Sequence, residues 1–74
     1  MQENQSEVAW LRAQITLECE AIRRVLEEPA CVASHAAIHT RYRNLGTHQS
    51  ALESQVGEQE ATSVLVEIYQ QVVG

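Results

Sequence analysis

Two apolar stripes at helical spacing run along the first third of the sequence, and this double pattern constrains the fold most strongly. The main stripe repeats every three or four residues and consists of Val8, Leu11, Ile15, Cys19, Ile22 and Leu26. A second stripe lies on nearly the opposite side of the helix and consists of Trp10, Ala13, Leu17 and Ala21. The sequence therefore predicts a helix over about residues 5–27. One partner helix in the same chain cannot cover both of its sides.

Pro29 interrupts the helical pattern and predicts a tight hairpin. Proline breaks a helix interior but is tolerated in a first turn, so the second helix is expected over about residues 30–56. Its inward face consists of Cys31, Ile38, Tyr42, Leu45, Leu52 and Val56. Gly46 lies inside this helix and indicates either a kink or a close contact with another helix.

Gly57 predicts the end of the second helix, and a shorter third helix is expected over about residues 58–73. The inward face of the third helix consists of Ala61, Val64, Leu65, Ile68 and Val72, and its side stripe consists of Val66, Tyr69 and Val73. No repeat or linker divides the chain. The predicted fold class is therefore all-α, with residues 1–74 forming one helical domain: an antiparallel helical hairpin plus a shorter third helix.

Apolar residues that a single copy leaves uncovered predict a homo-oligomer. A chain of 74 residues buries a small fraction of its surface, so its stability is marginal without a partner chain. The uncovered residues are Trp10, Leu17, Val66, Tyr69 and Val73. Each would lose roughly 1.5 to 3 kcal/mol of burial in water. Because such residues in stripes mark interfaces, we expect copies of the chain to assemble through them as a helical bundle. The alternative is that three helices wrap closely enough to cover both sides of the first.

Charge and composition disfavour several classes of partner. The formal net charge is −5, so a nucleic-acid backbone or an anionic membrane surface would repel the average surface. No segment approaches the roughly twenty apolar residues needed to cross a bilayer. The N-terminus lacks a basic segment followed by an apolar run, and the two cysteines are too few for a disulfide framework. We therefore expect a cytoplasmic protein with free thiols.

The arginines indicate a site for a small anion. All five lie between residues 12 and 43, there is no Lys, and the guanidinium group binds phosphate or carboxylate with two hydrogen bonds at once. His35, His39 and Arg43 follow one another at intervals of four residues, on one stripe of the second helix. The candidate binding residues are Arg41, Arg43, His39, His35, Tyr42, Arg23 and Arg24. This set predicts a pocket near protomer interfaces for a phosphorylated ligand, such as a nucleotide signal that the oligomer sequesters.

Three alternatives to an anion pocket stay open. Cys31 lies four residues before His35 on the same stripe, and Cys and His side chains at this spacing suit a transition metal. Glu18 or Glu20 could complete such a site, although the fixed charge of Arg43 would repel a cation. A structural role would instead pair the arginines with glutamates along the helix faces, and Glu18 in particular is expected to be the partner of an Arg. The third alternative is an interaction or scaffold protein that pairs with another helical protein and binds no small ligand.

Catalysis has little support in the sequence, so we predict a protein that is not an enzyme and has no cofactor. There is no nucleophile elbow, no glycine-rich phosphate loop, no paired CxxC motif and no Asp. Cys19 and Cys31 lie on predicted core faces, where a thiol behaves as a small apolar group.

Overall fold

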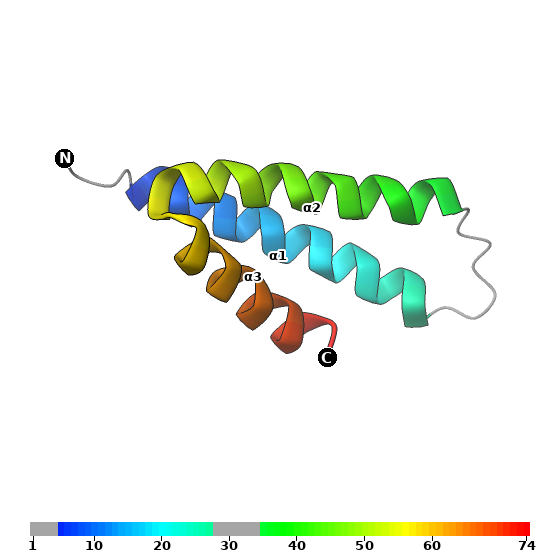
Figure 1. The fold of residues 1–74 in the computed structure, drawn as a ribbon. Coiled ribbons are helices and arrows are strands. Elements are labelled where there is room, and N and C mark those ends of the chain that lie inside the picture. Colours follow the sequence, from blue (N-terminus) through cyan, green and yellow to red (C-terminus); the bar gives the residue numbers. More distant parts are fainter. Residues whose placement is uncertain (1–4, 28–34) are drawn as a thin grey trace.

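Three helices make up the part of the chain that the structure describes (Figure 1). Helix α1 spans Gln5–Glu27, α2 spans His35–Val56 and α3 spans Glu58–Val72. The structure is a computed structural model, and it describes residues 5–27 and 35–74. Within these residues there is no strand, so the predicted all-α class is confirmed.

The predicted helix bounds agree closely with the observed ones. The bounds of α1 are those that its two apolar stripes predict, and α3 ends one residue earlier than expected, at Val72. The expected start of the second helix at about residue 30, together with Pro29, lies outside the described residues. The apolar pattern together with Gly57 therefore placed α1, α3 and the end of α2.

Helices α1 and α2 lie side by side with opposite chain directions, and α3 packs against both (Figure 1). The three helices differ in length, since α1 has 23 residues and α3 has 15. At a rise of 1.5 Å per residue, α3 is about 12 Å shorter than α1. The C-terminal end of α1 therefore extends beyond the end of α3 (Figure 1).

The core lies between the three helices and uses the predicted inward faces. Its buried residues are Leu11, Ile15, Cys19 and Ile22 from α1, Leu45 and Leu52 from α2, and Ala61 and Ile68 from α3. All eight were predicted to face inward. The main stripe of α1 is therefore its core face, and no polar side chain is fully buried among the described residues.

Two residues predicted to face inward are exceptions: Tyr42 of α2 is 42% exposed, and the prediction that Leu26 belongs to the core is also wrong. The side chain of Leu26 is 63% exposed, although it continues the main stripe of α1 in perfect register. The physical reason is the length of α3, which ends before it reaches this last turn of α1. Helical periodicity gives the direction in which a side chain points, but the neighbouring helix decides whether anything covers it.

The two internal glycines have different roles. Gly57 separates α2 from α3 with φ of +92°, a conformation that L side chains rarely adopt, and its N–H donates to the carbonyl of Glu53 at 2.9 Å. The predicted helix end at Gly57 is therefore confirmed. At Gly46, by contrast, α2 continues without interruption, and an added Cβ would meet no atom within 4 Å. The prediction of a close helix contact at Gly46 is wrong, because this position faces open space.

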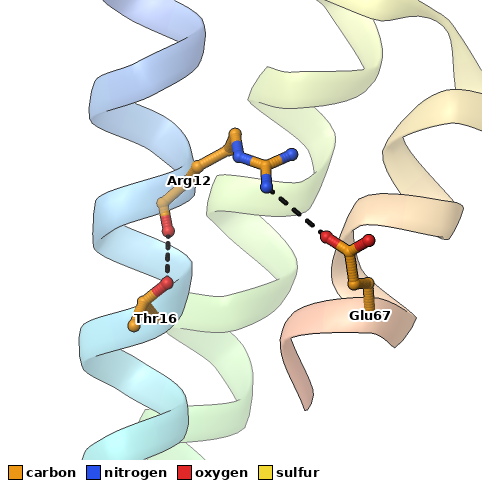
Figure 2. A network of polar contacts seen from close by, with 3 residues as sticks. All are labelled: Arg12, Thr16 and Glu67. Atoms are coloured by element: carbon orange, nitrogen blue, oxygen red, sulfur yellow. Dashed lines mark hydrogen bonds and ion pairs between the residues drawn. The ribbon is translucent and has the colours of Figure 1, made fainter. Parts of the chain in front are cut away.

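An ion pair between α1 and α3 helps to fix how these helices lie against each other (Figure 2). Arg12 Nη2 lies 3.5 Å from Glu67 Oε1, and both side chains are exposed. The Thr16 hydroxyl donates to the carbonyl of Arg12 at 2.9 Å, one turn along α1. Exposed ion pairs contribute at most about 1 kcal/mol, so apolar burial provides most of the stability of the fold.

The contrast between Leu52 and Leu26 gives a direct test of this core. Leu52→Ala should lower the free energy of unfolding by about 2 to 5 kcal/mol, because the side chain is fully buried and its loss leaves a cavity. Leu26→Ala makes the same chemical change at an exposed position and should cost less than about 0.5 kcal/mol. Urea denaturation followed by circular dichroism measures both. Equal losses for the two variants would contradict the described core.

Candidate functional site

The second stripe of α1 lies on the outside of the three described helices and includes two large apolar side chains that are more than half exposed. We call Trp10, Ala13, Leu17 and Ala21 the outer stripe. Trp10 is 56% exposed and Leu17 is 54% exposed, while Ala13 is exposed and Ala21 is partly buried. The sequence predicted that neither α2 nor α3 would cover this side, and the described helices leave it open to solvent. Large apolar side chains in such a row are typical of an interaction surface.

Trp10 is held at one side by His48 of α2. Their ring centroids are 6.2 Å apart and their planes are nearly perpendicular, at 89°. Edge-to-face contacts of this kind orient an aromatic ring without burying it. The Trp10 ring is therefore positioned at the border of α1 and α2, with more than half of its surface free for another contact.

Helix α3 adds less uncovered apolar surface than the sequence predicted. Val66 is exposed as expected and lines an open depression of about 460 Å³ whose other lining residues are polar: Thr62, Ser63, Glu67, Gln70 and Gln71. Tyr69 and Val73, however, are partly buried and pack against the core of their own chain. The predicted interface residues therefore divide into an exposed group on α1, an isolated Val66, and two residues that the fold itself already uses.

Two of the predicted anion-binding arginines are engaged in ion pairs. Arg41 Nη1 lies 3.2 Å from Oε1 of Glu18, whose side chain is only 12% exposed. Arg23 Nε lies 3.2 Å from Glu27 Oε2, one turn further along α1. The expectation that Glu18 is the partner of an Arg is thereby confirmed. An anion that binds Arg41 has to compete with this nearly buried carboxylate for the guanidinium charge, which raises the cost of binding.

The remaining candidate residues do not converge on one face. Successive helix residues turn by about 100°, so Arg41 and Arg43 lie about 200° apart around α2. Arg43 and His39 are exposed and share another side of α2, and the side chain of His35 lies outside the described residues. Within the described residues, Arg24 and Arg43 have no ion-pair partner.

A small apolar cavity lies near the end of α1 that extends beyond α3. Its lining residues are Ile22, Val25, Leu26, Ile38, Arg41 and Tyr42, and its volume is about 20 Å³. A space of this size holds about one water molecule, so it is far too small for a nucleotide.

The hydroxyl groups of Tyr42 and Tyr69 lie 3.1 Å apart and link α2 to the last turn of α3. This hydrogen bond raises the pKa of Tyr69 above its ordinary value, and partial burial raises it further. The sequence analysis placed Tyr42 among the candidate binding residues, and in the structure its hydroxyl joins two helices. No sequence signal pairs these tyrosines, because their contact depends on how α2 and α3 lie side by side.

The described residues offer little for metal binding or nucleophilic chemistry. No group of three His, Cys, Asp or Glu side chains among them could hold a metal ion, and Cys31 lies outside them. Burial raises the pKa of the Cys19 thiol, and the carboxylate of Glu18 raises it further. A thiol with a raised pKa stays protonated at neutral pH and is a poor nucleophile. None of the described helices combines the length and the apolar character that a membrane crossing needs.

Comparison with known proteins finds no family pattern, no characterised protein and no solved structure that matches this chain.

The Tyr42–Tyr69 contact predicts a specific dependence of stability on pH. Because the folded chain holds the Tyr69 proton more tightly than the unfolded chain, this contribution is fully present below the unfolded pKa of about 10 and is lost as the pH rises through the folded pKa. The free energy of unfolding should therefore fall more steeply in the wild type than in Tyr69→Phe between about pH 9 and pH 11. Chemical denaturation at several pH values measures the slopes. Both proteins retain Cys19, whose pKa is also raised by burial, so parallel slopes would contradict the assignment to Tyr69.

Proposed function

We propose that this chain is a non-catalytic assembly protein, in which an antiparallel helical hairpin and a third helix associate with further copies as a homo-oligomeric bundle. The observation that carries the proposal is the outer stripe of α1, where Trp10 and Leu17 are each more than half exposed. The partner in this proposal is the chain itself.

The energetics of the outer stripe support self-association. Fully burying one large apolar side chain stabilises a structure by roughly 1.5 to 3 kcal/mol. Because Trp10 and Leu17 are each about half exposed, an interface that covers them can still gain about half of that energy from each side chain. A small domain has a total stability of about 5 to 15 kcal/mol, so an interface on this stripe would add a substantial fraction. Selection for a monomer would favour polar residues at these positions.

The distribution of charge favours an assembly role over a ligand pocket. Two of the proposed ligand arginines, Arg23 and Arg41, are already paired with glutamates, and the cavity beside Arg41 is small and apolar. A binder of small anions would be expected to gather its cations on a concave surface, whereas a protein that works by assembly has an apolar row that a partner can cover. The described surface fits the second pattern better.

Substitution on the outer stripe tests the proposed assembly. Leu17→Glu should shift the protein toward single copies, because a charge replaces an apolar side chain at the centre of the interface, while helix content stays unchanged. Leu26→Glu is the matched control, since it makes the same change at a similarly exposed leucine outside the outer stripe. Sedimentation equilibrium over a range of concentrations measures the masses. A wild-type protein that sediments as a single copy at every concentration would overturn the proposal.

Anion binding is a second candidate function, and its candidate site is the side of α2 that carries His39 and Arg43. His39 and Arg43 are four residues apart and exposed, and Arg43 has no ion-pair partner among the described residues. Symmetric assembly would bring the same pair together from more than one copy and supply the further cations that a phosphate group needs.

A thermal-shift experiment with nucleotides and cyclic nucleotides tests this second candidate. We expect a ligand at 100 times its dissociation constant to stabilise the fold by about 2.7 kcal/mol, and we expect Arg43→Ala to abolish the shift. Arg12→Ala is the control, because Arg12 pairs with Glu67 on another side of the bundle. No shift with any nucleotide, or an equal loss in both variants, would remove anion binding at Arg43.

A further inference from the structure

The outer stripe continues along α1 to Arg24, and the extended row has the same spacing when it is followed in either direction. With Arg24 as its last member, the row Trp10, Ala13, Leu17, Ala21 and Arg24 has intervals of three, four, four and three residues. The row is therefore symmetric about Leu17. A second copy of α1 that runs in the opposite direction places Leu17 against Leu17, Ala13 against Ala21, and Trp10 against Arg24.

On the basis of the proposed function, we infer that α1 pairs antiparallel with α1 of a second copy about a twofold axis at Leu17, with Trp10 of each copy stacked on Arg24 of the other. A twofold interface uses the same surface on both subunits, and the symmetric row provides such a surface. The occupant of the outer stripe is thus a second copy of this chain.

The small residues of the row suit a close approach of two helices. Interaxial distances of about 8 to 10 Å depend on the size of the side chains at the contact, and alanines allow the short end of this range. Ala13 and Ala21 lie on either side of Leu17 at one helical turn. Leu17 of one copy therefore contacts Leu17 of the other, and the flanking alanines allow the two helix backbones to approach closely.

Trp10 and Arg24 complement each other across copies. The Trp10 ring is 56% exposed and is fixed at one side by His48, while Arg24 is exposed and has no ion-pair partner within the described residues. A guanidinium group over an indole face is a favourable cation–π contact. The two residues are fourteen positions apart on α1, or about 21 Å, so they cannot meet within one copy. An antiparallel second copy brings them together twice.

The same residues disfavour a parallel pair. In parallel register Arg24 would lie against Arg24 and Trp10 against Trp10, which brings like charges together and leaves the cation–π contacts unmade. Leu17 lies against Leu17 in either orientation. The orientation is therefore decided by the residues on either side of Leu17, and these residues define the experiment.

Disulfide cross-linking of single-cysteine positions tests the orientation. In a Cys31→Ser background, where the remaining native thiol of Cys19 is buried, Leu17→Cys should form a cross-linked dimer on oxidation. Ala13→Cys alone should form none, since two copies of position 13 would be about 12 Å apart, beyond the reach of a disulfide. A mixture of Ala13→Cys and Ala21→Cys should form a cross-linked heterodimer.

The dissociation constant of the dimer tests whether Trp10 of one copy stacks on Arg24 of the other. Trp10→Ala and Arg24→Glu should each raise the dissociation constant of the dimer by about tenfold. Arg23→Glu makes the same charge change one residue away, about 100° around α1, and should change it by less than about threefold. Circular dichroism establishes that each variant keeps its helices.

The outcomes separate this inference from the proposed function. An oligomer in which Ala13→Cys links to itself, or in which none of the cysteine positions forms a cross-link, overturns the antiparallel pairing and leaves self-association standing. Equal weakening by Arg23→Glu and Arg24→Glu overturns the stacking. A protein that sediments only as single copies overturns the proposed function, and the inference falls with it.

Discussion

The structure depends on the burial of one apolar side of α1 against α2 and α3. Among the described residues, the core face of α1 supplies four of the eight buried core residues, and α2 and α3 supply two each. Burial of these side chains provides most of the favourable free energy in a domain of this size, while the exposed ion pairs contribute little. The consequence of this arrangement is that α1 has a second apolar side, which the two other described helices leave largely exposed to water. The proposed assembly is a consequence of this imbalance.

Helical periodicity predicted the parts of the fold that depend on a single helix. The bounds of α1 and the eight buried residues follow from apolar residues repeated at three and four positions, and Gly57 marked the turn before α3. The exposure of Leu26 did not follow, because it depends on where α3 ends relative to α1. The open space around Gly46 depends in the same way on how the helices lie together, which a one-dimensional pattern does not contain.

The candidate site was predicted less well than the fold, for a related reason. Proximity in sequence suggested that Arg41 and Arg43 act together, but a continuous α2 turns them to different sides. Glu18 was correctly expected to pair with an Arg, yet the sequence did not indicate that its partner is Arg41. Contacts between helices, such as Tyr42 with Tyr69, require the lateral register of two elements. The outer stripe was found from sequence because it belongs to one helix.

Fluorescence of Trp10, the only tryptophan in the chain, tests the central claim most directly. In a single copy the indole is more than half exposed, and in the proposed assembly another copy covers it. The emission maximum should therefore move to shorter wavelength as the protein concentration rises, with the same midpoint as the change in mass. An emission maximum typical of a water-exposed indole at every concentration, in a protein that remains helical, would contradict it.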